Sequence, residues 1–221
     1  MSYGIRLFVS GDFACFTRPE MKVERVSYGV MTPSAARGVL ESIHWKPAIR
    51  WIITAIHVLK PIRFQSIRRH EVAHKMSVAS VRSAMKTGNL ANLSLVASED
   101  RQQRAASVLI DVAYVIEARF ELTSHAGPDD SVGKHLDTFN RRARRGQCFH
   151  QPYLGTREFP ANFHAIAADG PSFNTIDDTR DLGFMLYDID HARNRAALFF
   201  RARLEKGVMQ IPEPTSPEIR R

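Results

Sequence analysis

An alternation of apolar and polar positions marks the first predicted strand. From Tyr3 to Ser10, aliphatic residues occupy positions 5, 7 and 9, with Arg6 and Phe8 between them. This period of two is typical of a strand that buries one face. The next segment, residues 11–25, has mixed charges and no period, and we expect a loop there.

A helical period follows. Thr32 and Pro33 have the residue types of an N-cap and a first helical position. From Ser34 to Trp45 the apolar residues recur every three or four positions, which predicts a helix. Pro47 is expected to end this helix, because proline cannot continue the hydrogen-bond ladder.

Three later segments are predicted strands. Residues 49–58 are rich in β-branched side chains and predict a buried strand. Residues 59–67 contain Pro61, which favours an edge strand. Residues 107–122 carry the strongest strand pattern in the chain. The polar, basic segment 68–104 has little periodicity and is predicted to be an insertion with one short helix or a loop.

A second helix is predicted from Val132 to Arg145, after the sequence Asp129-Asp130-Ser131 and before Gly146. A last strand within residues 155–167 would complete the order βαββαβ. This order predicts an α+β, ferredoxin-like fold of the kind that RNA-recognition domains share.

The C-terminal part changes character. Gly170-Pro171 predicts a turn, and residues 184–189 and 196–204 predict two strands of a small antiparallel β-sheet. We expect the tail from Pro212 to be loose. The predicted domains are therefore residues 1–168, with the insertion at about 68–104, and residues 169–221.

Composition narrows the class of protein. The chain has 221 residues, 44% of them hydrophobic, and a formal net charge of +8, so we expect a globular protein that attracts polyanions. No window approaches the roughly 18 apolar residues of a membrane span, and the first residues lack a secretory leader pattern. Cys15 and Cys148 match no zinc or redox spacing. These features predict a cytoplasmic protein without a membrane partner.

The segment from Gly133 to Phe159 carries the strongest functional signal. A Lys134-His135 pair is followed by four arginines at helical spacing and then by several aromatic residues. One interpretation is a solvated basic helix face. The other is a nucleic-acid site, because guanidinium groups bind phosphates and a histidine beside a lysine can move protons near neutral pH.

Other histidines have weaker signals. His44, at the end of the first predicted helix, either caps the helix or reacts. His70 and His74 are four apart and would share a helix face, but they lack acidic or thiol partners at suitable spacing, so no metal site is predicted. His150 lies in a predicted turn, where it either contacts RNA or orders the loop.

Three separated stretches resemble one known family. They read VERVSYGVMTPSAARGVLESIHWKP (residues 23–47), GKH (133–135) and RRARRGQCFHQPYLGTREF (141–159). They are similar to the CRISPR-associated repeat-processing endoribonucleases of the type I-C (Dvulg) system, and the similarity extends to IPEP at residues 211–214. The resemblance implies a ribonuclease without metal or cofactor that cuts the repeat hairpin of precursor CRISPR RNA. It also implies an N-terminal ferredoxin-like domain, a C-terminal β-sheet subdomain, and retention with the guide RNA among the other subunits of the interference complex.

In that family the site combines a tyrosine at the end of the first helix with a Lys-His pair. The pair corresponds to Lys134 and His135, and His44 stands at the tyrosine position. Histidine has an ordinary pKa near 6.5 and tyrosine near 10, so this departure places a better base there. We predict that His44, Lys134 and His135 are catalytic. They would cleave by attack of a ribose 2′-OH, leaving a 2′,3′-cyclic phosphate and a 5′-OH.

A further set of basic residues is assigned to RNA contacts. It comprises Arg68, Arg69, Lys75, Arg141, Arg142, Arg144, Arg145, His150 and Arg157. Two alternatives stay open. One is a scaffold that holds the 5′ handle of the guide RNA without cutting, as expected if His44 disables the site. The other is binding of double-stranded DNA, with which a net charge of +8 is compatible.

Overall fold

The computed structural model describes residues 4–91, 93–167, 173–191 and 193–220. The predicted domain boundary at 168/169 and the predicted Gly170-Pro171 turn lie outside these ranges. The chain forms two compact units. One comprises Ser66–Ala106, and the other comprises the segments Met1–Gln65 and Ser107–Arg221.

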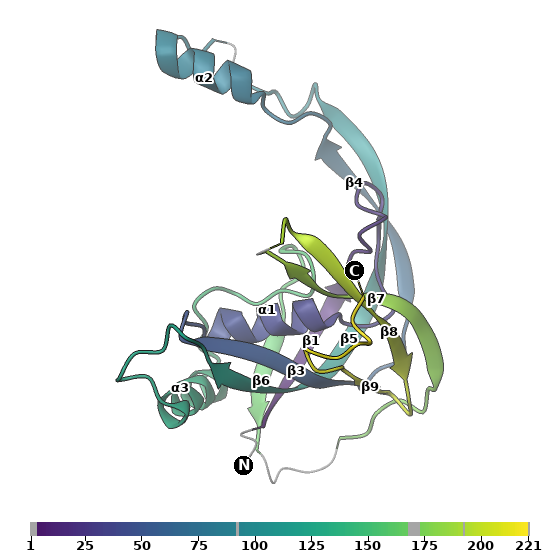
Figure 1. The fold of residues 1–221 in the computed structure, drawn as a ribbon. Coiled ribbons are helices and arrows are strands. Elements are labelled where there is room, and N and C mark those ends of the chain that lie inside the picture. The colour runs from purple at the N-terminus through teal and green to yellow at the C-terminus, as the bar shows by residue number, and fades with distance from the viewer. Residues whose placement is uncertain (1–3, 92, 168–172, 192, 221) are drawn as a thin grey trace. The chain divides into compact units, whose positions relative to one another are not determined.

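An antiparallel sheet is the centre of the larger unit (Figure 1). Its strand order is β6-β1-β5-β3-β9, and β2 also pairs with β5. The bounds are β1 Ile5–Ala14, β2 Arg25–Val26, β3 Ile49–Val58, β5 Arg101–Leu122, β6 Asn162–Ile166 and β9 Val208–Gln210. With the helices described below, this is a mixed α and β architecture.

The sheet pairing explains where the first strand ends. Leu7 lies opposite Ile116, and both side chains are buried. The pairing continues to Ala14 opposite Leu109, four residues beyond the predicted end of the strand. The expectation of a loop was wrong for residues 11–14, because a partner strand that is remote in sequence fixes the end of β1.

Helix α1 spans Pro33–Ile43 and packs on β3. The predicted cap is confirmed: Thr32 Oγ1 accepts a hydrogen bond from the backbone N–H of Ala35 at 3.3 Å. The helix ends at Ile43, two residues before the predicted end, because His44 adopts an extended backbone (φ −152°, ψ 118°). The His44 carbonyl instead accepts a hydrogen bond from Nε1 of Trp51 at 2.9 Å.

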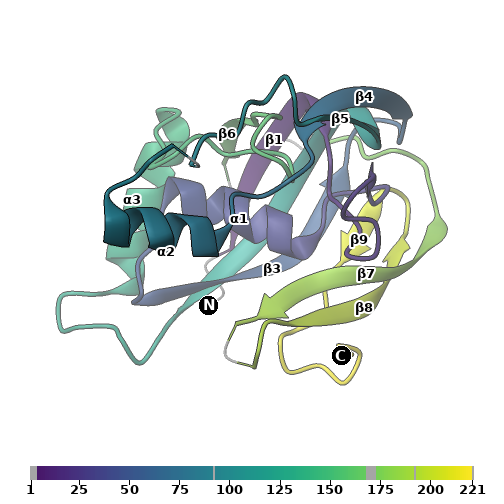
Figure 2. The same cartoon turned by 90° about the horizontal axis from the view of Figure 1, so that it is seen from above.

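Helix α3 spans Val132–Arg144 and packs on β6. Its predicted start is confirmed, because Ser131 Oγ accepts a hydrogen bond from the backbone N–H of Lys134 at 3.3 Å. Buried Phe139 contacts the ring of Trp51 with the centroids 5.0 Å apart. Both views of the fold place α3 beside one end of α1 (Figures 1 and 2). This arrangement brings the candidate site together.

Strands β7 (Arg180–Asp190) and β8 (Ala196–Leu204) form a two-stranded sheet that contacts α1. An ion pair of 2.7 Å joins Arg37 of α1 to Asp188 of β7. The expectation of a loose tail was wrong. Arg220 and Phe199 exchange two backbone hydrogen bonds of 2.7 Å, so β8 holds the end of the chain.

The smaller unit comprises most of β4 (Phe64–Val72), helix α2 (Val78–Thr87) and the first residues of β5. Strand β4 pairs with β5. His70 lies in β4, and His74 follows that strand in contact with Asp100. The expectation that the two histidines share a helix face was therefore wrong. Along the described stretches of the chain, no helix is both long and apolar enough to cross a membrane.

Candidate active site at the end of helix α1

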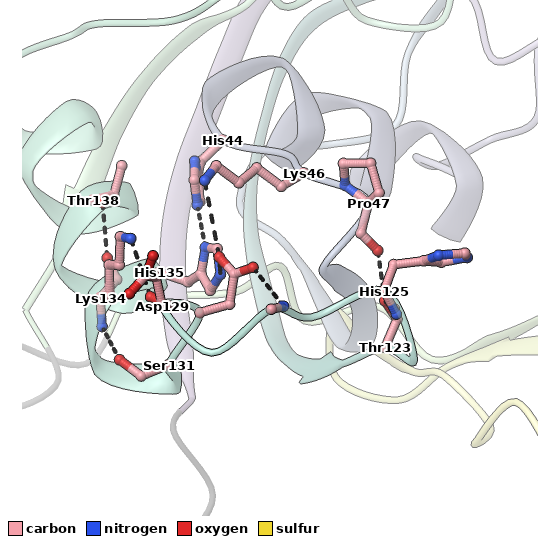
Figure 3. A network of polar contacts seen from close by, with 12 residues as sticks. His44, Lys46, Pro47, Thr123, His125, Asp129, Ser131, Lys134, His135 and Thr138 are labelled. Carbon is pink, nitrogen blue, oxygen red and sulfur yellow. Dashed lines mark hydrogen bonds and ion pairs between the residues drawn. The ribbon is translucent and has the colours of Figure 1, made fainter.

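Two buried histidines meet where α1 ends and α3 begins (Figure 3). Nε2 of His44 and Nδ1 of His135 lie 3.0 Å apart, at hydrogen-bond distance. His44 exposes 4% of its surface and His135 exposes 1%. The N-cap at Ser131 places His135 one residue after the exposed Lys134, on the inward side of the first turn of α3. The structure thus brings together two predicted residues that are 91 positions apart.

A carboxylate completes this pair. Oδ1 of Asp130 lies 3.1 Å from Nε2 of His135, the ring nitrogen that faces away from His44. This is an ion-pair distance, although the angles do not make it a regular hydrogen bond. Oδ2 of Asp130 accepts the backbone N–H of Gly127 at 3.0 Å, and this bond is the main cause of a lowered pKa of the carboxyl. Asp130 is therefore ionised at neutral pH.

When both rings are neutral, attraction to the Asp130 carboxylate, 3.1 Å from Nε2 of His135, favours one arrangement of the ring hydrogens. A carboxylate only accepts, so Nε2 of His135 carries the hydrogen and Nδ1 of His135 is an acceptor. His44 must then donate from Nε2, which leaves the lone pair of its Nδ1 free to take a proton. Sequence reasoning missed Asp130, which it used only as a signal for the start of a helix.

Burial and nearby cations lower the pKa of His44 to about 4. The largest cause is the loss of water around the ring, followed by the electrostatic effects of His135, Arg142 and Lys46. At pH 7 the ring is therefore neutral and able to act as a base.

Lys134 takes a different position from the two rings. Its side chain is exposed, and Nζ donates a hydrogen bond to the carbonyl of Asp129 at 3.1 Å (Figure 3). A second lysine, Lys46, lies nearer the line of histidines, with Nζ 3.9 Å from Oδ1 of Asp130. The Lys134 ammonium is thus held by the loop before α3, while the two imidazoles are held by each other.

An open pocket of about 420 Å³ lies beside His44. Its lining comes from the end of α1 and the residues after it, from the last turn of α3, and from the segment that follows α3: Glu41, His44, Trp45, Lys46, Arg142, Phe149 and His150. His44 and two cationic side chains therefore face one space in which a substrate can lie. Such a site can bind an anion and remove a proton from it.

The predicted arginines of α3 fall into two groups. Arg142 is partly buried, and its Nη1 donates to the carbonyl of Ile43 at 2.8 Å, which ties α3 to the end of α1. Arg141, Arg144 and Arg145 are exposed and line a second, smaller hollow together with Asp137. Arg142 thus stabilises the packing at the candidate site. Arg141, Arg144 and Arg145 form an exposed cationic surface to which an extended anion can bind.

The remaining predicted RNA contacts are spread over the two units. Arg157 is exposed in the loop before β6 of the larger unit. In the smaller unit, Arg68 and Arg69 lie on β4 and Lys75 lies after it. Arg68 and Lys75 are exposed, whereas Arg69 is half-buried.

Comparisons with known proteins agree on one family. A family model described as CRISPR-associated protein (Cas_Cas5), of the Cas5d type, matches residues 4–212. A protein of Mannheimia succiniciproducens named CRISPR pre-crRNA endoribonuclease Cas5d is 54% identical over 225 residues and is covered over 100% of both chains. A protein of the same name from Thermus thermophilus is 38% identical over 98% of this chain and 95% of its own. In fold, the chain is similar to a crystal structure of a CRISPR-associated protein, with a TM-score of 0.71, 22% identity and coverage of 100% and 97%.

Proposed function

Because this chain belongs to the Cas5d family of CRISPR-associated proteins, we propose that it is an endoribonuclease that cuts precursor CRISPR RNA within its repeat hairpin. Relatives at 54% and 38% identity carry the name of that activity. The observation that carries the proposal is the hydrogen bond between His44 and His135 at the edge of an open, cationic pocket.

In the proposed mechanism His44 is the base. Its Nδ1 takes the proton of a ribose 2′-OH, and the oxygen then attacks the adjacent phosphorus. His135 and Asp130 lie behind His44 and hold its tautomer, in the way that an aspartate orients the histidine of a catalytic triad. The two rings are bonded to each other, so they act as one unit rather than as an acid and a base on opposite sides of the phosphate.

The cations around the pocket stabilise the second negative charge of the phosphorane. Lys46 and Arg142 line the pocket itself. Lys134 reaches the phosphate by exchanging its bond to the Asp129 carbonyl for one to a phosphate oxygen. The 5′-oxygen takes a proton from a water molecule as it leaves, and the products are a 2′,3′-cyclic phosphate and a 5′-OH. His44 later returns the proton of the 2′-OH to solvent, so the steps need only the protein side chains and water, and no metal or cofactor is part of the proposal.

The sheet supports a finer assignment of the fold, which we infer to be ferredoxin-like. The neighbouring strands in the order β6-β1-β5-β3 are antiparallel, and α1 and α3 each connect strands that another strand separates. We assign residues 1–168, with the insertion at about 68–104, to the RNA-binding and catalytic domain. Residues 169–221, which contain β7 and β8, form the C-terminal subdomain. After cleavage the protein stays on the guide RNA as a subunit of the type I-C interference complex.

The test is cleavage of a repeat RNA by the purified chain in the presence of EDTA. We expect one cut with a 2′,3′-cyclic phosphate end, because the nucleophile belongs to the RNA and the base to the protein. The same RNA with a single 2′-deoxy nucleotide at the cut should bind and remain intact. Binding of both RNAs without any cut would mean that the chain is a scaffold for the guide RNA. Cutting of the deoxy substrate would exclude the 2′-OH mechanism.

The exposed arginines of α3 should contribute to binding through phosphates. We expect Arg144→Ala with Arg145→Ala to weaken binding of the repeat RNA and to reduce the slope of log affinity against log salt by about 1 to 2, since each lost phosphate contact releases about one counterion fewer. A double variant on β8, Arg201→Ala with Arg203→Ala, removes the same charge and should leave the slope unchanged. Equal slopes for the two double variants would contradict the assignment.

A further inference from the structure

Two large aromatic side chains border the pocket beside His44 and remain in water. Phe149 exposes 87% of its surface and Trp45 exposes 54%. Trp45 follows directly after His44, and Phe149 comes from the segment after α3. A single exposed apolar residue is ordinary in a folded protein. Two aromatic rings at one pocket, next to the candidate base, form a surface that a flat ligand would fit.

The exposure of Phe149 is built into the fold. Its backbone N–H donates to the carbonyl of Ser42 at 2.7 Å, which fixes the segment against the last turn of α1. Two residues further on, Nε2 of Gln151 donates to the carbonyl of Ala161 at 2.9 Å. Gly155 then passes so close to the backbone just after β1 that a Cβ would lie 2.1 Å from the carbonyl oxygen of Cys15. These contacts fix the backbone of this segment beside the end of α1, and the ring of Phe149 lies exposed at the pocket.

The polar lining indicates the kind of ligand. Lys46, Arg142 and His150 share the pocket with the two aromatic rings. A phosphate alone would not require the aromatic rings, and an apolar side chain would not require the cations. A nucleotide uses both, because its base stacks on aromatic faces and its phosphate binds cations. The volume of about 420 Å³ falls within the range of pockets that hold small ligands, about 300–1,000 Å³.

We propose that this pocket holds one unstacked nucleobase of the RNA beside the cleaved phosphate, against Phe149 and Trp45. The inference rests on the proposed function and adds to it a binding site for a particular nucleotide. Taking a base out of the stack frees the backbone on either side of it. The ribose can then turn its 2′-OH toward Nδ1 of His44 and bring the attacking oxygen into line with the leaving oxygen. The pocket would select an accessible nucleotide at the cut, while the arginines of α3 hold phosphates regardless of sequence.

The probe is a repeat RNA that carries a 2′-deoxy nucleotide at the cut, so that it cannot be cleaved, and a 2-aminopurine at each neighbouring position in turn. We expect the fluorescence to change on binding at one position beside the cut. Phe149→Ala should abolish that change and weaken binding about 5- to 150-fold, the range measured for loss of one stacked base. Phe149→Trp should retain both. The matched control is Phe184→Ala, which removes an exposed phenylalanine of β7 that does not line this pocket.

Two results would overturn the proposal. One is an unchanged fluorescence response in Phe149→Ala, with an affinity equal to that of Phe184→Ala. This is also the result expected if the pocket holds a side chain of a partner protein instead. The other is the lack of a response at every position beside the cut. This experiment measures binding, so its result does not depend on nuclease activity. A fluorescence response combined with no cleavage of the all-ribose repeat would support base binding in this pocket and refute the proposed nuclease activity.

Discussion

Replacing His44 by glutamine should slow repeat cleavage about 10³-fold, within the range of 10²–10⁴ that a positioned general base contributes. The amide of glutamine can still donate to Nδ1 of His135, so the buried neighbour keeps its partner. What is lost is the lone pair that takes the 2′-OH proton. Affinity for the uncleavable 2′-deoxy repeat should stay within a few-fold, measured by filter binding or anisotropy.

Two controls separate the base from other roles. His125→Ala removes an exposed histidine in the loop between β5 and α3, whose side chain points away from the pair (Figure 3), and it should cleave at the wild-type rate. The second control is an RNA in which sulfur replaces the 5′-oxygen at the cut. A thiol has a pKa of about 8.5, so a thiolate leaves without an acid.

The sulfur-containing RNA distinguishes a base from an acid at His44. Loss of a base slows attack on both linkages equally, so the glutamine variant should remain about 10³-fold slower on the thio substrate. Recovery of the wild-type rate on that substrate would instead make His44 the acid. Because burial lowers the pKa of His44 to about 4, its protonated form is scarce at pH 7, which favours the role of base.

Local signals in the sequence were sufficient for most elements. Thr32 and Ser131 cap the two long helices because a side-chain oxygen three residues before a free N–H suffices for a cap. The β-branched segment 49–58 became β3 with the predicted bounds. The wrong predictions concerned segments whose structure depends on partners remote in the chain. The end of β1 is set by β5, and the C-terminal tail is held by β8.

The candidate site also has some features that the sequence predicts and others that only the structure shows. The types of His44, Lys134 and His135 drew attention to them in the sequence, supported by a family resemblance. The hydrogen bond between the two rings depends on how α1 and α3 pack, which no local pattern records. Asp130 had no distinct signal, because an acidic residue before a helix has a common structural explanation. Phe149 was one of several aromatic residues in the basic segment that could stack on a base or belong to the core, and the sequence did not separate it from the others. Their roles follow from contacts with residues far away in sequence.

Among residues that do not contact the substrate, we expect Asp130→Asn to cause the largest loss of cleavage activity. Oδ1 of the new amide would take the N–H of Gly127, and its NH₂ group would then face Nε2 of His135. That ring must respond by accepting at Nε2 and donating from Nδ1. His44 would accept at Nε2 and carry its hydrogen on Nδ1, so the lone pair that should meet the 2′-OH disappears.

We expect this change to lower kcat about 10²- to 10³-fold, less than the roughly 10⁴-fold loss in a catalytic triad, because the carboxylate is one ring further from the substrate. KM and the affinity for 2′-deoxy repeat RNA should change little. The direct measurement is the ¹⁵N chemical shifts of His44, which report the ring nitrogen that carries the hydrogen. A residue with a merely structural role would leave that tautomer unchanged.

Two matched variants test the argument. Asp129→Asn removes the neighbouring carboxylate. Lys134 binds the backbone carbonyl of residue 129 and not its side chain, so this variant should keep the wild-type kcat. Lys46→Met removes the ion pair with Asp130 but leaves the carboxylate facing His135, so the His44 tautomer should stay as in the wild type. Equal kcat values for Asp130→Asn and Asp129→Asn would show that the carboxylate does not position His44. A changed tautomer in Lys46→Met would assign the effect to the lysine, since the orienting carboxylate is still present in that variant.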